Sequence, residues 1–197
     1  MADGPDARAR LTAAAGRSFA ERGFSATTTR DIAARAGMSP AAVYVHHSSK
    51  EELLFLISRD GHDAALRVVT AAAASSEDPG QQLWATVREF ALWHAVHHSV
   101  ARVVQYEGCA LSREHHALIA SRRRAIEQVL RDVIEFGVQR GDFHCDDVPG
   151  TTMAILSLVV DVARWYRDGG PRTPDQIADL YAELALRMVG HQPRTTR

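Results

Sequence analysis

Three hydroxyl side chains within residues 27–54, those of Thr28, Ser39 and Ser49, stand where the N-cap of a helix would stand. The first and the last are followed three residues later by an acidic residue, which is the capping-box pattern, and the second is followed directly by proline, which suits the first turn of a helix. Backbone N–H groups at a helix N-terminus bind phosphate oxygens. Three helix starts in so short a stretch therefore make it a candidate polyanion site.

The same stretch predicts two short helices joined by a turn. The first follows Thr28 and ends at a glycine after about eight residues, and the second runs from Pro40 to about His46. Helices this short are not stable alone, so they must pack against a longer helix over about 7–22 and a long helix that starts at Lys50. This is the helix-turn-helix plan, whose second helix enters the DNA major groove. Three small core helices with ordinary caps would show the same pattern.

The rest of the chain also favours helices, because apolar residues recur at a spacing near 3.6 and alternating β-branched runs are missing. We expect further helices over about 81–97, 99–107, 112–140 and 151–167, and a last one after Thr173. The predicted fold is all-α with about nine helices. The expected division is a helix-turn-helix domain over residues 1–50 and a larger helical domain over residues 51–197.

Charge is divided unevenly along the chain. Residues 1–50 carry seven basic and four acidic side chains, whereas the remaining residues carry 16 basic and 20 acidic ones. A mildly basic head on an acidic body suits a polyanion-binding head. No apolar run reaches the roughly 18 residues of a membrane span, and the first residues lack the apolar segment of a signal peptide. We therefore expect a soluble, cytoplasmic protein with no membrane partner.

Three motifs follow one another between Phe19 and Ile57: F-x-x-x-G-F-x-x-T-T, I-A-x-x-A-G-M-S and Y-x-H-H-x-S-K-E-x-L. Together they resemble the N-terminal DNA-binding domain of the TetR family of bacterial transcriptional regulators, over about the first quarter of the chain. His47 stands where that family usually has phenylalanine. An imidazole can pack there as a half-buried ring, and it bears on the stability and the pH response of the domain.

The resemblance implies a DNA-binding surface at the start of the second helix, on the exposed face of the third and at the start of the fourth. The chemistry agrees, since Arg30 can bind guanine in bidentate fashion, a contact worth about 1–3 kcal/mol of discrimination. Ala41 can offer a methyl group to thymine, while Tyr44 and Lys50 suit phosphates. A core position for Tyr44 and a solvated one for Arg30 are the alternatives. The expected DNA-binding residues are Thr28, Thr29, Arg30, Ser39, Pro40, Ala41, Tyr44, His46 and Lys50.

A single recognition helix spans only a few base pairs, so a specific site needs two heads about 34–36 Å apart, one turn of DNA. We therefore expect a homodimer on a palindromic operator in double-stranded DNA. The helix that follows Thr151 is apolar nearly all round, which favours burial of one face inside the chain and another against a partner; complete burial inside a monomer is the alternative. The resemblance implies an interface formed by the last two helices. Its expected residues are Leu158, Val162, Ile177, Leu180 and Leu184.

Aromatic residues mixed with small ones in the body leave room for a cavity, although such stripes also form ordinary cores. The resemblance implies a pocket there for a small-molecule effector that releases the DNA. The stretches R-V-V-Q-Y-E-G, from Arg102, and D-V-A-R-W-Y-R-D-G-G-P, from Asp161, are similar to those of TetR-family repressors of fatty-acid and steroid catabolism, several of which sense CoA thioesters. The expected effector is an acyl-CoA or another hydrophobic metabolite. The expected ligand-binding residues are Trp84, Trp93, His97, Tyr106, Arg164 and Trp165.

Other classes of function fit less well. An enzyme is not expected, because the chain has no G-x-S-x-G, P-loop or H-E-x-x-H motif, and no cofactor is assigned. A DNA-binding protein without an effector remains an alternative, but it would need no long aromatic body and would be more basic. A metal-responsive regulator is another alternative, because His94 and His98 have a spacing used for zinc. No carboxylate or cysteine completes a compact site nearby, so no metal site is assigned.

Overall fold

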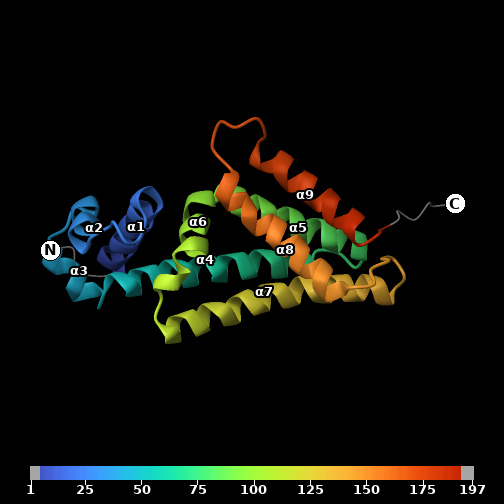
Figure 1. Ribbon diagram of the computed structural model, residues 1–197, viewed down its shortest axis with the longest axis horizontal. Helices are drawn as coiled ribbons and strands as arrows, with labels where there is room; N and C mark the ends of the chain where they lie inside the picture. Colours follow the sequence, from blue (N-terminus) through green and yellow to red (C-terminus); the bar gives the residue numbers. More distant parts are fainter. Residues whose placement is uncertain (1–4, 192–197) are drawn as a thin grey trace. The chain divides into compact units, whose positions relative to one another are not determined.

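The computed structural model describes residues 5–191 (Figure 1) and confirms an all-α fold over that range, with nine α-helices, one short 3₁₀ turn and no strand. The helix starts and ends lie within a few residues of those expected from the sequence. Among the described residues, no helix has the length and apolar character needed to cross a membrane. The helices are α1 (Pro5–Arg22), α2 (Thr29–Ala36), α3 (Pro40–His46), α4 (Lys50–Ala73), α5 (Pro79–Val96), α6 (His98–Tyr106), α7 (Arg113–Gln139), α8 (Val148–Trp165) and α9 (Pro174–Met188).

The chain forms two compact units. The first unit comprises the residues up to His62 together with Ser99–Ala120, and the second comprises Asp63–His98 together with the residues from Ser121 onward. The first unit extends beyond residue 50, because it includes the first part of α4 and α6 from Ser99 onward. The helices α4 and α7 each begin in the first unit and end in the second.

The first unit is built around one hydrophobic cluster that joins its short helices to its long ones. Leu11 of α1, Ile32 of α2, Val43 of α3 and Leu53 of α4 are each 0% exposed and belong to that cluster. Full burial of such a side chain is worth about 1.5–3 kcal/mol relative to exposure. Because α2 has eight residues and α3 only seven, this burial rather than helix propensity holds them in place.

The N-terminus of α2 has the predicted capping box. The Thr28 hydroxyl accepts a hydrogen bond from the Asp31 N–H, and the Asp31 carboxylate accepts one from the Thr28 N–H at 2.9 Å. The Thr28 hydroxyl also donates to the Asp31 carboxylate at 2.6 Å, and this bond, followed by the one from the Thr28 N–H, lowers the pKa of Asp31. Gly37 ends the helix in the left-handed conformation with φ 67°, which glycine adopts without strain. Cap and stop together fix where α2 begins and where the turn to α3 starts.

The two other expected caps of this stretch differ from the prediction. Ser39 occupies the N-cap position of α3, but its side chain makes no capping hydrogen bond, so Pro40 in the first turn is the stronger start signal. The Ser49 hydroxyl accepts from the Glu52 N–H at 3.0 Å, whereas the Glu52 carboxylate accepts from the Ser48 N–H instead of closing the box on Ser49. The second capping box is therefore only half formed.

The second unit packs α5 against α8 and α9, and its core is completed by the later parts of α4 and α7 (Figure 1). Phe90, Ile134, Ile155 and Val159 are among its buried side chains. The last helix begins after Thr173, as the sequence predicts, and its N-terminus carries a full capping box between Thr173 and Gln176. These contacts make a continuous helical body.

A charged cluster fastens α5 to the start of α9. The Arg88 guanidinium donates to Asp179 and to Asp175, each at 2.7 Å, and to Glu89 at 2.8 Å. The bond to Asp179 contributes most to raising the pKa of Arg88 above its usual range. The cluster therefore fixes the position of α9 along α5.

Gly137→Ala tests the packing of the second unit. A Cβ at this position would overlap the ring of Phe143, which is 2% exposed. Because the buried ring cannot move freely, we expect the free energy of unfolding to fall by about 1–3 kcal/mol. Thermal unfolding followed by circular dichroism should show a melting temperature lower by about 2–4 °C for each kcal/mol.

The matched control is Gly16→Ala, a helical glycine of α1 whose added Cβ would lie 3.8 Å from the Ile57 Cδ1, an ordinary contact. It should leave stability unchanged or raise it by up to about 1 kcal/mol through helix propensity. An equal melting temperature for Gly137→Ala and the wild type would contradict the packing described.

Candidate nucleic-acid interface

The exposed face of α3 is the most prominent candidate binding surface of the first unit. Val43 is the only described residue of α3 that is buried, while Ala41, Tyr44 and Val45 are exposed at positions i, i+3 and i+4. The exposed fractions of Tyr44 and Val45 are 63% and 73%, large for side chains of this size. We call the side chains of Ala41, Tyr44 and Val45 the recognition face. They offer methyl groups and one phenol to a partner.

Tyr44 is also connected to the start of α2. Its hydroxyl lies 3.1 Å from the Thr29 Oγ1, so these two expected DNA-binding residues form one hydrogen-bonded pair across the turn. Pro40 is exposed beside them and His46 is half-buried. Val45 was not expected from the sequence, although its helical spacing from Ala41 could have identified it.

Arg30 is the exposed cation beside this surface that makes no ion pair or hydrogen bond with any described residue. Other arginines of the first unit are engaged: Arg35 forms a two-pronged contact with Glu21, and Arg22 lies 3.5 Å from Asp31. The contact with Arg35 lowers the pKa of Glu21. Arg30 thus keeps its five N–H donors for an external acceptor.

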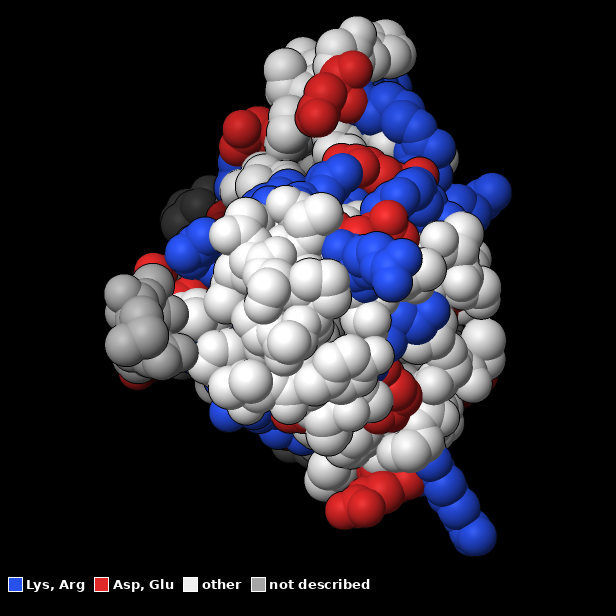
Figure 2. Space-filling model, turned by 90° about the vertical axis from the view of Figure 1, so that its left-hand side faces the viewer, with Lys and Arg blue, Asp and Glu red and all other residues white. Residues whose placement is uncertain are grey.

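Figure 2 shows the side of the molecule on which α2 and α3 lie. An uncharged area occupies the middle of this view, and both basic and acidic side chains border it. The uncharged area suits contacts to base edges and the basic side chains suit phosphates, because phosphate contacts position a protein and base contacts select the sequence.

Lys50, expected to bind phosphate, is used within the chain. Its Nζ donates to the backbone oxygens of Phe24 at 2.8 Å and Thr27 at 2.9 Å, and it lies 4.2 Å from the centroid of the Phe24 ring. Two of its three N–H groups are thereby engaged in holding the turn between α1 and α2. That turn ends at Thr28, the cap of α2, so Lys50 positions the start of the candidate surface. A phosphate would have only the third N–H to bind.

The expected ligand-binding residues are not brought together. Trp84, Arg164 and Trp165 are exposed, and Tyr106 lies in the first unit. Trp93 and His97 are neighbours on one helix face, with ring centroids 5.1 Å apart. The side chain of Arg164 is paired with Asp161 at 2.6 Å. Within the second unit, Trp84, Trp93, His97, Arg164 and Trp165 lie outside the wall of the small apolar cavity described next.

A small apolar cavity of about 10 Å³ lies inside the second unit, where α4, α5, α7 and α8 meet. The one hydroxyl in its wall belongs to Thr86, which is 1% exposed and whose Oγ1 has no hydrogen-bond partner among the described residues. The spacing of Thr86, Val87 and Phe90 along one helix is the sequence signal that could have indicated this wall. The lining residues are Val69, Thr86, Val87, Phe90, Ile126, Leu130, Ile155, Leu156 and Val159.

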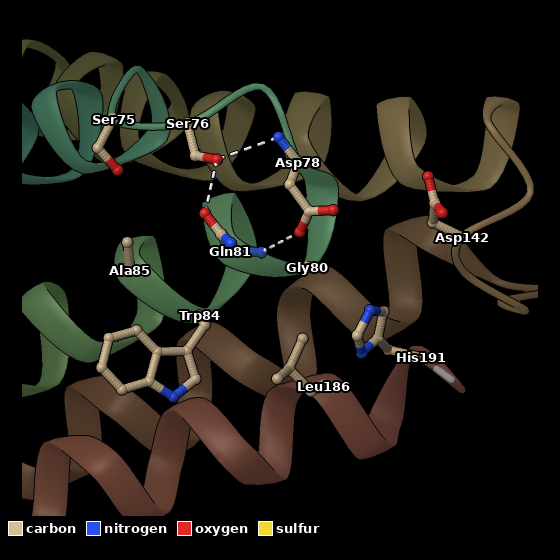
Figure 3. Close-up of a pocket in the computed structure, with 10 residues that line it drawn as sticks. All are labelled: Ser75, Ser76, Asp78, Gly80, Gln81, Trp84, Ala85, Asp142, Leu186 and His191. Carbon is tan, nitrogen blue, oxygen red and sulfur yellow. Dashed lines mark hydrogen bonds between the residues drawn. The ribbon is translucent and has the colours of Figure 1, made fainter. Parts of the chain in front are cut away.

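A larger hollow of about 630 Å³ opens beside Trp84, between the start of α5 and the end of α9 (Figure 3). Three of its polar residues bond to one another: the Ser76 Oγ donates to the Gln81 side chain at 3.0 Å, and the Asp78 carboxylate accepts from the Gln81 N–H at 2.8 Å. These bonds form the start of α5. The polar lining therefore serves the fold, and we assign no ligand to this hollow.

Two of the five expected interface residues belong to the core. Val162 is 0% exposed and Ile177 is 1% exposed, and both pack with Ala95 and Tyr166 inside the second unit. These two residues are apolar because α8 and α9 pack on α5 there. Their side chains are therefore not on the outer surface of the unit, and we correct the expectation that they lie in an interface. Leu158 is 43% exposed. Leu180 and Leu184 are half-buried on α9.

The histidines of the body are engaged separately. The Nδ1 of His94 lies 2.9 Å from the Phe90 carbonyl oxygen, and that of His98 lies 3.0 Å from the Ala95 carbonyl oxygen. Among the residues described, no three His, Cys, Asp or Glu side chains gather in a way that could hold a metal ion. The described residues therefore give no observation in favour of a metal-responsive regulator.

Comparison with known proteins agrees with the geometry. The family model of bacterial regulatory proteins, tetR family, matches residues 11–57, and that of the tetracyclin repressor-like C-terminal domain matches residues 76–189. The HTH-type transcriptional repressor KstR2 of Mycobacterium tuberculosis is 32% identical over 183 residues, which cover 91% of this chain and 90% of that repressor.

Solved structures show the same fold. A bacterial regulatory protein of the tetR family from Rhodococcus RHA1 is 46% identical, with a TM-score of 0.90 over 94% of this chain and 98% of that one. AibR, solved in complex with isovaleryl coenzyme A and operator DNA, is 26% identical, with a TM-score of 0.83 over 95% of this chain and 100% of that one. The helix-turn-helix of α2 and α3, the helical body and these relatives together show that the chain is a DNA-binding transcriptional regulator of the TetR family.

Proposed function

We propose that this regulator binds a palindromic operator as a homodimer and is released from it by an acyl-CoA. The observation that carries the DNA-binding part is the recognition face of α3, which stays exposed while Val43 alone anchors the helix. Arg30 and the N-terminus of α2 lie next to it in sequence and supply donors for guanine or phosphate. The proposed location is the cytoplasm, where operator DNA is accessible.

The homodimer is supported by apolar side chains left exposed on α8 and α9. Met153 is 65% exposed, Leu158 43%, Trp165 41% and Met188 36%. Soluble monomers rarely expose several large apolar side chains on neighbouring helices, because each costs hydrophobic free energy. Leu158 remains in the proposed interface, together with Leu180 and Leu184. Two copies joined there would present two recognition helices to one operator.

The acyl-CoA effector is supported by the apolar cavity and by the relatives. The structure of AibR includes isovaleryl coenzyme A, and KstR2 of Mycobacterium tuberculosis is described as a ketosteroid transcriptional regulator. The cavity wall is apolar apart from the Thr86 hydroxyl, which could bond to the carbonyl of an acyl group. A basic group for the CoA phosphates would have to lie outside this cavity.

The small size of the cavity supports a mechanism of release. A volume of about 10 Å³ holds about one water molecule, so an acyl chain can enter only if the surrounding helices move apart. α4 supplies Val69 to the cavity wall and Lys50 to the turn before α2. A ligand that binds the widened form more tightly therefore favours a changed position of α4. The first turn of this helix also supports the DNA-binding surface.

Arg30→Ala combined with Tyr44→Ala tests the DNA contacts. Loss of one bidentate contact to guanine costs about 1–3 kcal/mol, so operator affinity should fall about tenfold or more. Footprinting should show lost operator protection, while circular dichroism stays helical. The control is Arg67→Ala, which removes an exposed arginine from α4 in the second unit and should leave protection intact. Sequence-specific protection by the double variant would remove α2 and α3 from the interface.

Lys50→Met separates positioning from phosphate binding. If Lys50 acts through the Phe24 and Thr27 carbonyls, the melting temperature and the operator affinity should both fall. The slope of log affinity against log salt should then stay as in the wild type, because no phosphate contact is lost. A slope smaller by about 0.9 for each lost contact, with an unchanged melting temperature, would identify Lys50 as a phosphate ligand instead. Arg67→Met, on the same helix, controls for the loss of one charge.

Leu156→Trp tests the effector site by filling the cavity from a half-buried position of its wall. In a fluorescence-anisotropy assay, isovaleryl-CoA or a longer acyl-CoA should release the wild type from its operator, and free CoA should not. Because the larger ring cannot fit into about 10 Å³ and itself pushes the wall helices apart, the variant should bind the operator more weakly and respond little to acyl-CoA, whereas Val96→Trp, at a 56% exposed position of α5, should respond as the wild type does. Equal release of Leu156→Trp and the wild type would place the effector elsewhere.

A further inference from the structure

His47 is a buried, unpartnered imidazole at the joint between the recognition helix and α4. It is the C-cap of α3, three residues before α4 begins, and its side chain is 0% exposed. Neither ring nitrogen makes a hydrogen bond of ordinary geometry with a described residue, although the Arg8 backbone lies near enough to favour the protonated ring. Buried polar atoms are nearly always hydrogen-bonded in folded proteins, so this ring departs from a strong rule. A buried ring without ordinary hydrogen bonds, directly after the helix that faces DNA, suggests a functional role for His47.

The groups that face His47 come from three helices. From α4, the Glu52 Oε1 lies 3.9 Å from the Nδ1, too far for a hydrogen bond. From α1, Arg8 brings a positive charge, and on α3 itself His46 is the neighbouring titratable group. A proton on His47 would thus add a cation where two other basic groups already lie.

The Glu52 carboxylate is already engaged and cannot turn to His47 without losing other bonds. It accepts from the Ser48 N–H at 2.5 Å and from the Ser48 hydroxyl at 2.8 Å, and the Arg8 guanidinium donates to it at 3.1 Å. Although burial acts against it, the bonds from Ser48 lower the pKa of Glu52, which stays ionised. The one acid beside His47 therefore belongs to the network that fixes the start of α4.

Burial lowers the pKa of His47, and the Glu52 carboxylate and the Arg8 backbone oppose that effect only in part. The folded protein consequently binds fewer protons at this position than the unfolded chain, whose histidine pKa is about 6.5. The contribution of His47 to the free energy of unfolding is then fully present above about pH 6.5. It declines as the pH falls from there toward the lower folded-state pKa. Below the folded-state pKa this group causes no further loss.

We propose that His47 makes operator binding proton-sensitive: a proton on the ring expels it from the joint between α3 and α4 and releases the recognition helix from its binding geometry. The inference rests on the proposed DNA contacts of α3 and adds a form of regulation to them. It predicts weaker binding in acid. This direction is opposite to that of a histidine that contacts phosphate directly, where a proton would add attraction.

The test measures operator affinity by fluorescence anisotropy from about pH 7.5 to 5.5, which brackets the pKa of free histidine, at constant ionic strength. Wild-type affinity should fall about threefold or more toward pH 5.5, and the melting temperature should fall with it. His47→Phe, which keeps an aromatic ring without a proton site, should bind at pH 7.5 and lose most of this dependence. His46→Gln, the matched control on the same helix, should keep it.

Each outcome decides the matter. An unchanged pH profile in His47→Phe would overturn the inference, as would wild-type binding that strengthens in acid and follows His46. His47→Leu provides a second non-titrating side chain, so that a folding defect of one variant leaves the test intact. Absence of wild-type operator binding at pH 7.5 would instead refute the proposed DNA contacts, which separates the two failures.

Discussion

The candidate DNA-binding surface depends on the burial of two helices that are too short to be stable alone. α2 and α3 have eight and seven residues, and each is held by a few side chains in the hydrophobic cluster with Leu11 and Leu53. Because Val43 is the one described residue of α3 that is buried, the recognition face of Ala41, Tyr44 and Val45 is free to contact a partner. The position of the recognition face therefore depends on packing by α1 and α4, and anything that shifts α4 bears on DNA binding.

Polar groups at the start of α4 add to this dependence. Lys50 holds the turn before α2, Glu52 holds Ser48 and Arg8, and His47 is buried between them without a hydrogen bond. Charged residues in this segment thus act within the chain, whereas Arg30 is the cation left for an external partner. α4 also reaches the apolar cavity of the second unit through Val69. α4 therefore carries residues of both the proposed effector site and the segment that supports the candidate DNA-binding surface.

Local signals in the sequence predicted the fold well. Hydroxyl caps, a left-handed glycine and proline in the first turn act within four residues, so Thr28, Gly37 and Thr173 could be assigned from sequence alone. Ligand and interface residues were predicted less well, because residue type does not reveal which face of a helix is covered. Val162 and Ile177 are apolar as an interface residue would be, yet they fill the core. Lys50 shows the same limit, since its carbonyl acceptors lie more than 20 residues away in the chain.

The central claim is that two recognition faces on one dimer select one operator. Selection of bound duplexes from a random DNA library, followed by sequencing, tests it most directly. The enriched duplexes should share an inverted repeat. Its half-sites should be centred about 10–10.5 base pairs apart, or a multiple of that spacing. Enrichment of a single unrepeated half-site, or of no common sequence at all, would contradict it.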